Sequence, residues 1–373
     1  MRPTPIEIAI SLGDPAGIGP EVTSATLHAL RPQDVRFHVY GDPAALGRAG
    51  GVPEHVTVTA CASAEVTPGA PDARAAHGVV DAISRAARGC LTGRYDALVT
   101  GPIAKSILGE AGYTFPGHTE LLEEIAGDGR AVMMLVGGAL RVVPATIHVP
   151  LREVPARLDT GALHSLIQTV HRDLVTRFGI AQPRIAVCGL NPHAGESGRF
   201  GDEEATTIGP AVAAARAGGI DARGPVSADS IFSRAVRGEL DVVIGMYHDQ
   251  VLGPLKLHAF GDAVNVTLGL PLVRTSVDHG TAFDIAGRGI ADPGSMRAAI
   301  ELAIELARRS RTRPAAPRTT HTRDGRDPRR AIEPGGESAT ASSDERATES
   351  ERATESERAR QAAPAATREG PCA

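Results

Sequence analysis

The hydrophobic positions of residues 1–309 fall in short β-branched runs that alternate with longer stretches of helical periodicity. IEIAISL (Ile6–Leu12), VRFHVYG and RIAVCGL (Arg184–Leu190) have the length and composition of buried strands. DALVTG (Asp96–Gly101), RVVPATIH (Arg141–His148) and DVVIGMYH (Asp241–His248) repeat the pattern. Strands that alternate with helices many times indicate an α/β fold with a mostly parallel sheet.

The C-terminal part of the chain changes in composition. A helix is expected over Ser295–Arg308, whose apolar residues share one face. From about residue 310 the chain is rich in Arg, Pro, Thr, Ser and Glu, and ERATES occurs at Glu345–Ser350 and again at Glu351–Ser356. Such a segment cannot bury enough apolar surface to offset the entropy of ordering it. We expect a catalytic domain over residues 1–309 and a disordered low-complexity tail over residues 310–373.

Length and charge narrow the class of protein. The chain has 373 residues, 42% of them hydrophobic, which suffices for a large core organised as two lobes. Its formal net charge of -5 creates no field that attracts nucleic acid. It contains neither an N-terminal signal sequence nor an apolar run of the roughly 18 residues that a membrane helix needs. We expect a cytoplasmic protein that binds neither nucleic acid nor membranes.

Three histidines lie at or just after the ends of expected strands. They are His148 in TIHVPLR, His193 in GLNPHAGESG and His248 in MYHDQ. Ligands of open α/β sheets bind beyond the carboxyl ends of the strands, and imidazole is a good ligand for zinc and similar divalent ions. Each histidine alone is equally compatible with an ordinary polar loop residue. The pattern leaves both interpretations open, a catalytic metal site and three unrelated loop histidines.

Two loops combine glycine with polar side chains. GDPAGIGPE (Gly13–Glu21) has the glycine order G-x-x-x-G-x-G, which is neither the dinucleotide fingerprint nor a P-loop. It is either a tight strand-to-helix turn or part of the lining of an active cleft. PGHTE (Pro116–Glu120) places an imidazole and a hydroxyl at a helix start, which favours anions. Thr119 could equally serve there as the helix cap.

A third region contains basic and amide side chains followed by a glycine-rich stretch. Lys256, Asn265 and Arg274 suit a phosphate or carboxylate, although exposed basic residues are usually only solvated. Lys105 and Lys256 are the only lysines of the chain. DHGTAFDIAGRGIADPGS (Asp278–Ser295) is too rich in glycine for a regular helix and too strongly patterned for a random linker.

Several of these motifs resemble those of known dehydrogenase families. DHGTAFDIAGRGIADP resembles the adenosine-binding loop of the isocitrate and isopropylmalate dehydrogenases. From about Ile6 to Arg308 the chain resembles the PdxA family, the 4-hydroxythreonine-4-phosphate dehydrogenases. The matching motifs, in order, are GDPAGIGPE, PGHTE, TIHVPLRE, GLNPHAGESG, GPVSADSIF, MYHDQ and VNVTLGLPLVRTSVDHGTAFDIAG. The resemblance implies an isocitrate/isopropylmalate dehydrogenase-like fold, with two interleaved lobes around a mostly parallel sheet and the active site in the cleft.

The resemblance also implies roles for individual residues. The implied ligands of one divalent ion (zinc, magnesium, cobalt or manganese), in a site shared across a homodimer, are His148, His193 and His248. The implied substrate-binding residues are His118, Thr119, Lys256, Asn265 and Arg274. The implied cofactor-binding residues are His279, Gly280, Thr281, Ala282, Asp284 and Asp292. Asp229, in SADS, is the candidate general base or orienting residue near the reacting centre, and Lys105 is a further candidate for proton transfer.

The implied reaction is the NAD-dependent oxidation of 4-phosphohydroxy-L-threonine to 2-amino-3-oxo-4-phosphobutanoate. A divalent ion would stabilise the developing alkoxide, and the β-keto acid would then lose carbon dioxide to give 3-amino-2-oxopropyl phosphate for pyridoxal phosphate synthesis. Asp284 matches a position that meets the adenosine ribose in the related dehydrogenases. Because a carboxylate there repels a 2′-phosphate, NAD is favoured, with NADP possible.

Other functions share parts of this pattern. Relatives of the family oxidise D-threonate or D-erythronate 4-phosphate, or aromatic cis-dihydrodiols. A phosphate acyltransferase, an activity found on a related fold, needs neither three metal-binding histidines nor an adenosine loop. The presence of His118, Asp229 and all three implied metal ligands argues against a binding protein that has lost catalysis.

Overall fold

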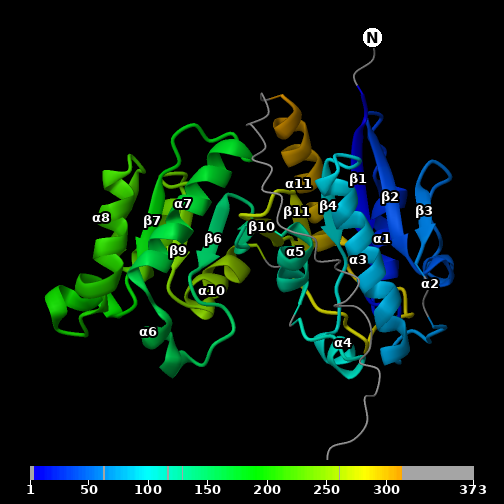
Figure 1. Ribbon diagram of the computed structural model, residues 1–373, viewed down its shortest axis with the longest axis horizontal. Helices are drawn as coiled ribbons and strands as arrows, with labels where there is room; N and C mark the ends of the chain where they lie inside the picture. The colour runs from blue at the N-terminus through cyan, green and yellow to red at the C-terminus, as the bar shows by residue number, and fades with distance from the viewer. Residues whose placement is uncertain (1–3, 62–63, 116, 128, 260, 313–373) are drawn as a thin grey trace, which may run out of the picture. The chain divides into compact units, whose positions relative to one another are not determined.

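The computed structural model describes residues 4–61, 64–115, 117–127, 129–259 and 261–312 (Figure 1). Its strands in the first part of the chain are β1 (Ile6–Ser11), β2 (Val35–Gly41), β3 (Thr57–Ala60) and β4 (Ala97–Thr100). The middle of the chain adds β5 (Val132–Gly137), β6 (Leu140–Pro144), β7 (Ile185–Cys188), β8 (Ala222–Val226) and β9 (Val242–Gly245). The last two are β10 (Val264–Leu268) and β11 (Arg274–Val277).

These strands form one 11-stranded sheet in the order β3-β2-β1-β4-β11-β10-β5-β6-β9-β7-β8. The pairs on both flanks are parallel, as the alternation of strands and helices predicted. The three central pairs, β11–β10, β10–β5 and β5–β6, are antiparallel. The chain therefore builds one flank, crosses to the other, and returns through β10 and β11.

Helices cover both faces of the sheet (Figure 1). On the flank of β1 they are α1 (Gly19–Ala29), α2 (Pro43–Arg48), α3 (Ala76–Leu91), α4 (Lys105–Glu110), α5 (His118–Ala126) and α11 (Gly294–Arg311). On the flank of β9 they are α6 (Val154–Arg157), α7 (Thr160–Thr176), α8 (Gly209–Ala217), α9 (Ala228–Val236) and α10 (His248–His258). The mixed α/β fold expected from the sequence is confirmed.

The strands are apolar on both faces because both faces are covered. Ile8 and Ile10 of β1 pack into a core with Met296 and Ile300 of α11. Ala9 points the other way, into a second cluster built on α3. Burial on both sides explains why IEIAIS is a continuous apolar run rather than an alternating one.

Three expectations about individual segments can be compared with the structure. The last helix runs Gly294–Arg311, slightly longer than Ser295–Arg308. Thr119 is not the cap of its helix, because α5 begins one residue earlier at His118 and Gly117 occupies the cap position. The low-complexity tail lies outside the described residues from residue 313 onward. The described chain belongs to one compact unit.

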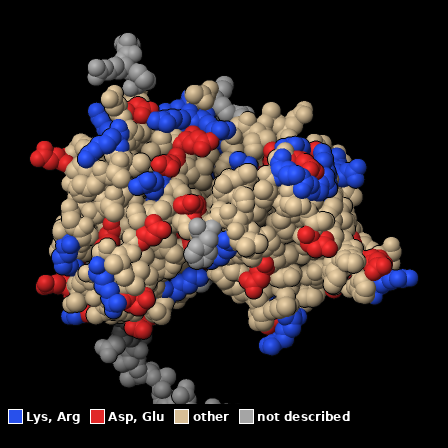
Figure 2. All heavy atoms as spheres, turned by 180° about the vertical axis from the view of Figure 1, so that it is seen from behind, with Lys and Arg blue, Asp and Glu red and all other residues tan. Residues whose placement is uncertain are grey.

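The surface and the helices add two observations. On the face drawn in Figure 2, acidic and basic side chains are interspersed, in keeping with the formal net charge of -5. Among the helices that the structure describes, none is long and apolar enough to cross a membrane.

Candidate active site

His148 and His248 come together at one edge of the sheet. β6 and β9 are parallel neighbours, and each histidine follows the carboxyl end of its strand. Backbone pairing continues beyond the strands, because the Ala145 amide donates to the Gly245 carbonyl at 2.7 Å and the Thr146 amide to the Met246 carbonyl at 3.2 Å. The Thr146 hydroxyl also donates to the Met246 carbonyl, at 2.7 Å. The two imidazole rings end with their centroids 5.7 Å apart. Two of the three predicted metal ligands are therefore juxtaposed.

The environment of this pair suits metal binding. Nδ1 of His248 lies 2.6 Å from Oδ1 of Asp249, an interaction that fixes the ring and leaves Nε2 for a ligand. Desolvation, helped by the positive charge of Lys105, lowers the pKa of His148. A neutral imidazole is the form that binds a metal. The donors present therefore fit a divalent ion, with other ligands still to be supplied.

His193 is placed differently. It lies after β7, the other neighbour of β9, in the segment η3 (Pro192–Gly198), where its side chain is exposed. Gln250 connects this region to the start of α10, since its amide donates to the Gly189 carbonyl at 2.8 Å. Within the described part of the single chain, no three His, Cys, Asp or Glu side chains are grouped to hold one ion. One chain thus supplies the pair His148 and His248 without His193.

Arg274 is the most unusual side chain of the site. It begins β11, is 2% exposed, and its guanidinium donates to the Thr100 hydroxyl at 2.6 Å and to the Thr267 hydroxyl at 3.0 Å. No carboxylate of the described chain forms an ion pair with it, and burial lowers its pKa to about 9. At pH 7 it remains a buried cation without a counter-ion, which favours an anionic ligand.

Two more groups lie close to Arg274. His118 begins α5, and its Nε2 is buried without a hydrogen-bond partner. Burial, together with the charges of Arg274 and Lys105, holds the pKa of His118 well below its ordinary range. Lys105 begins α4, and its Cε lies 3.2 Å from the position that a Cβ on Gly117 would take. The first of the two lysines therefore belongs to the site.

The second lysine has a carboxylate partner that the sequence analysis missed. Nζ of Lys256, near the end of α10, lies 3.7 Å from Oδ2 of Asp278, the residue after β11. Burial raises the pKa of Asp278, and the nearby Lys256, His279 and His248 oppose that rise. Asp278 therefore forms an ion pair with Lys256 and also interacts through its charge with His248 of the histidine pair. Its position directly after a buried strand was the available signal in the sequence.

The other predicted substrate residues take up different positions. Asn265 lies in β10, opposite Ser276 of β11, on the sheet face that also carries Thr267 and Arg274. Thr119 is the partly buried second residue of α5. Asp229 is exposed in the first turn of α9, a helix that packs against η3. In the described part of the chain Asp229 is thus associated with the His193 segment and makes no ion pair with Lys256.

The predicted cofactor loop, residues 278–293, contains no helix or strand, as its glycine content predicted. Nε2 of His279 is buried without a hydrogen-bond partner, and a Cβ on Gly280 would meet open space. Ala282 has a φ of 44°. The Nδ1 atom of the His279 ring donates to the Gly280 carbonyl at 2.9 Å, which leaves Nε2 of the neutral imidazole as an acceptor. A buried acceptor that has no partner among the described residues, beside an open glycine, fits a bound nucleotide, so the loop is compatible with a dinucleotide.

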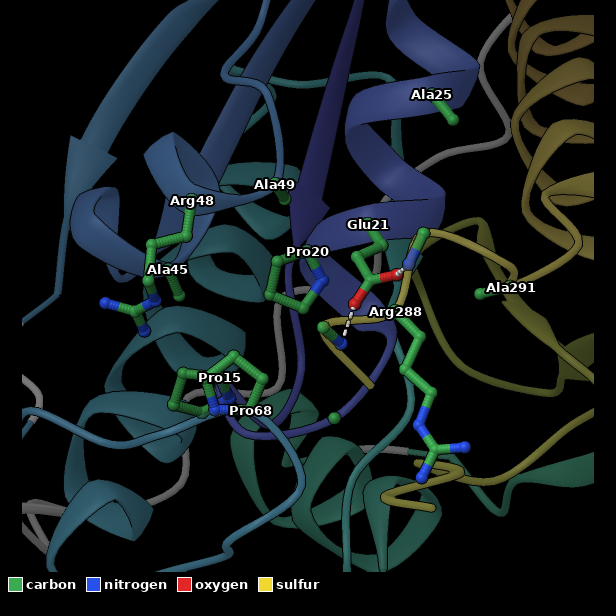
Figure 3. Close-up of a pocket in the computed structure, with 13 residues that line it drawn as sticks. Pro15, Pro20, Glu21, Ala25, Ala45, Arg48, Ala49, Pro68, Arg288 and Ala291 are labelled. Carbon is green, nitrogen blue, oxygen red and sulfur yellow. Dashed lines mark hydrogen bonds between the residues drawn. The ribbon is translucent and has the colours of Figure 1, made fainter. Parts of the chain in front are cut away.

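The two acidic residues of this loop differ. Asp284 is exposed, whereas Oδ1 of Asp292 accepts a hydrogen bond from the Gly294 amide at 2.9 Å at the start of α11. The turn at residues 287–291 borders a cavity of about 420 Å³ (Figure 3). Pro15, Pro20 and Glu21 of GDPAGIGPE also line this cavity. The motif forms the expected strand-to-helix turn between β1 and α1 and lies against the predicted cofactor loop. It also lines this cavity, so its part in an active cleft stays a prediction.

A histidine pair at the carboxyl ends of two strands and a buried cationic side chain, on a sheet covered by helices, are typical of α/β enzymes with small, anionic ligands. Residues 14–303 match the family model of the pyridoxal phosphate biosynthetic protein PdxA. The 4-hydroxythreonine-4-phosphate dehydrogenase of Geobacter metallireducens is 49% identical over 331 residues, which cover 83% of this chain and 97% of that protein. The chain belongs to the PdxA family, and the name that its relatives share places it among the oxidoreductases.

Two solved structures are similar to this chain. A 4-hydroxythreonine-4-phosphate dehydrogenase from Klebsiella pneumoniae has a TM-score of 0.74 and 39% identity, covering 81% of this chain and 99% of that one. A terephthalate 1,2-cis-dihydrodiol dehydrogenase from Burkholderia xenovorans has a TM-score of 0.59 and 30% identity, covering 80% of this chain and 98% of that one. The resemblance inferred from the motifs is therefore confirmed over the described domain.

Proposed function

We propose that this protein oxidises 4-phosphohydroxy-L-threonine to 2-amino-3-oxo-4-phosphobutanoate, which decarboxylates to 3-amino-2-oxopropyl phosphate in pyridoxal phosphate biosynthesis. NAD is the proposed oxidant, and a divalent ion the proposed second cofactor. The observation that carries the proposal is the buried guanidinium of Arg274, which forms no ion pair among the described residues. Its charge and that of Lys105 both act on His118, and the charge of Lys105 also acts on His148 of the histidine pair. A doubly anionic phosphate would supply the missing counter-charge.

The metal would be held by His148 and His248 of one chain and by His193 of a second copy. A divalent ion so bound supplies Lewis-acid polarisation of the substrate hydroxyl and of the resulting ketone. Exposed large apolar side chains support a homodimer. Leu151, which lines a pocket with His148 and His248, is 67% exposed. Phe200, seven residues after His193, is 49% exposed, and Leu257, near the end of α10, is 91% exposed.

The remaining residues have binding and positioning tasks in this proposal. Arg274 and Lys256 would hold the phosphate or carboxylate, with Asp278 orienting the Lys256 ammonium through their ion pair. The neutral His118 can exchange a hydrogen bond with the substrate through its free Nε2. Lys105 remains a candidate for proton transfer. Asp229, which is carried with His193, would reach the reacting centre as general base or orienting residue only from the second copy.

The dinucleotide would lie along His279, Gly280, Thr281 and Ala282. NAD, once bound, supplies the acceptor for the hydride that leaves the hydroxyl carbon. An exposed Asp284 can bond both ribose hydroxyls and repel a 2′-phosphate, which favours NAD over NADP. Arg48 and Arg288 line the neighbouring cavity, and their positive charge suits a 2′-phosphate, so NADP remains the alternative cofactor.

NADH formation with 4-phosphohydroxy-L-threonine, measured before and after chelation, tests the proposal. Activity that is lost on chelation and returns with a divalent ion is expected. Turnover that is insensitive to a chelator would contradict the metal mechanism. Assays in parallel use D-threonate 4-phosphate, D-erythronate 4-phosphate and an aromatic cis-dihydrodiol. Activity confined to one of these would contradict the proposed substrate, and activity on the dihydrodiol alone would point to the chemistry named for the Burkholderia xenovorans protein.

A further inference from the structure

The motif GDPAGIGPE touches the predicted cofactor loop at several points. The Ile18 amide donates to the Thr281 carbonyl at 2.9 Å. Gly17 passes so close to Thr281 that an added Cβ would lie 2.8 Å from its carbonyl oxygen. Glu21, in the first turn of α1, accepts hydrogen bonds from two loop amides, those of Gly287 and Gly289. These contacts join segments more than 260 residues apart in sequence.

The turn that Glu21 holds has contacts on one side, where a Cβ added to Gly287 would lie 2.8 Å from Pro68 and the Arg288 amide donates to the Ile285 carbonyl at 3.3 Å. It borders the cavity of about 420 Å³, so side-chain packing does not fix it from that side. Figure 3 shows the Glu21 carboxylate reaching across to the loop backbone, while the Arg288 side chain extends away from it. Two backbone donors on one carboxylate form charge-assisted hydrogen bonds, which are roughly twice as strong as neutral ones. On the side of the cavity, the Glu21 carboxylate therefore holds the path of residues 287–289 through the amides of Gly287 and Gly289.

We propose that Glu21 is a positioning residue for the dinucleotide. By holding the Gly287 and Gly289 amides, it sets the course of the loop whose preceding residues, His279 to Asp284, face the cofactor. This inference rests on the proposed function, because it assigns the loop to a dinucleotide. The motif GDPAGIGPE would then contribute to cofactor affinity through the loop that it positions, and it would not need to contact the phosphates of the dinucleotide.

The test compares Glu21→Gln with Glu301→Gln, an exposed carboxylate on α11 for which the structure describes no partner. The first measurement is backbone amide hydrogen exchange of residues 279–292 without ligand. Faster exchange is expected in Glu21→Gln alone, because an amide side chain offers one acceptor oxygen in place of two. Unchanged exchange would overturn the clamp itself.

The second measurement is the affinity for NADH, followed by fluorescence, together with KM for each substrate. We expect about a ten- to hundredfold loss of dinucleotide affinity in Glu21→Gln, with KM for the phosphorylated substrate nearly unchanged. Faster exchange with unaltered NADH affinity would overturn the positioning role. A wild-type protein that binds neither NADH nor NADPH would instead overturn the proposed function, and this proposal with it.

Discussion

Arg274 shows how one side chain combines a cost in stability with a capacity for binding. Burial lowers its pKa from the ordinary value of an arginine to about 9 on folding, so the folded state holds this proton less tightly than the unfolded chain. At pH 7 the buried charge therefore lowers the free energy of unfolding. The hydroxyls of Thr100 and Thr267 offset the cost only in part, because they carry no charge. Binding of an anionic ligand to Arg274 would remove this cost in stability.

Replacing Arg274 by methionine should separate these two effects. Inorganic phosphate is expected to raise the Tm of the wild type and to leave the Tm of Arg274→Met unchanged. Without phosphate the variant should be at least as stable as the wild type, because a buried uncompensated charge is gone. Differential scanning calorimetry at pH 7, with chloride at equal ionic strength for comparison, measures both quantities.

Arg216→Met is the matched control, since Arg216 is an exposed arginine on α8. It should retain the full phosphate shift. An equal phosphate shift in Arg274→Met would show that the anion binds elsewhere and would contradict the role given to this guanidinium.

Among the structural elements, η3 is the most strained. His193, Ala194, Gly195, Glu196 and Ser197 all have φ values between 41° and 79°, in the left-handed region that side chains other than glycine seldom adopt. The buried carboxylate of Glu204 holds this path, since it accepts from the Asn191 backbone amide at 2.8 Å and from its side-chain amide at 3.1 Å. Strain held in this way is common where a side chain is presented to a ligand.

Gly195→Ala and Gly198→Ala test whether this path matters for His193. Both glycines have positive φ, but a Cβ on Gly195 would lie 2.6 Å from Glu204 Oε2, whereas one on Gly198 would meet nothing within 4 Å. Both variants should lose about 1 kcal/mol of stability from the left-handed alanine. Only Gly195→Ala should also weaken metal binding, by roughly tenfold or more.

Metal content after dialysis against graded chelator concentrations gives the affinity, and thermal unfolding gives the stability. An equal loss of metal in both variants would show that backbone strain alone is responsible. Metal retention in Gly195→Ala at the wild-type level would contradict the placement of His193 as a ligand.

At the scale of the whole molecule, the proposed site needs two copies of the chain. His148 and His248 are adjacent in one chain, but the described residues of that chain give them no third ligand. Exposed Leu151 and Leu257 lie next to the pair in sequence or on the same helix, so a second copy would bury them together with the ion.

Mixing two inactive variants tests the shared site. His193→Ala and His248→Ala should each be inactive, because each removes a ligand from both sites of its homodimer. After unfolding and refolding together in equal amounts, half the dimers are mixed and each mixed dimer regains one intact site, so about a quarter of the wild-type activity should return. NADH formation and size-exclusion chromatography are the measurements. Absence of recovery in a mixture shown to contain mixed dimers would place all ligands in one chain.

Much of the candidate site could be predicted from the sequence because its residues lie at strand ends. β1, β2, β7 and β9 were evident from their apolar runs, and the carboxyl ends of parallel neighbours meet at one edge of the sheet. The central strands β5, β10 and β11 were not assigned from the sequence. β10 and β11 form a short antiparallel hairpin, whereas the pairing of β10 with β5 joins distant segments and cannot be read from a local pattern. Asp278 was overlooked because the strand that precedes it, β11, was not assigned, and because its contact with Lys256 forms only in the fold.

The sequence by itself determined the alternation of strands and helices, the motifs, the family and the identities of the candidate ligands. Only the tertiary structure decided which of them meet. It joined His148 to His248 and left His193 apart, it buried Arg274 without a counter-charge, and it set Glu21 against the loop at Gly287. The physical reason is that side-chain type and local periodicity are properties of short segments, whereas burial, charge pairing and hydrogen bonding across the chain depend on contacts that form only when distant segments pack.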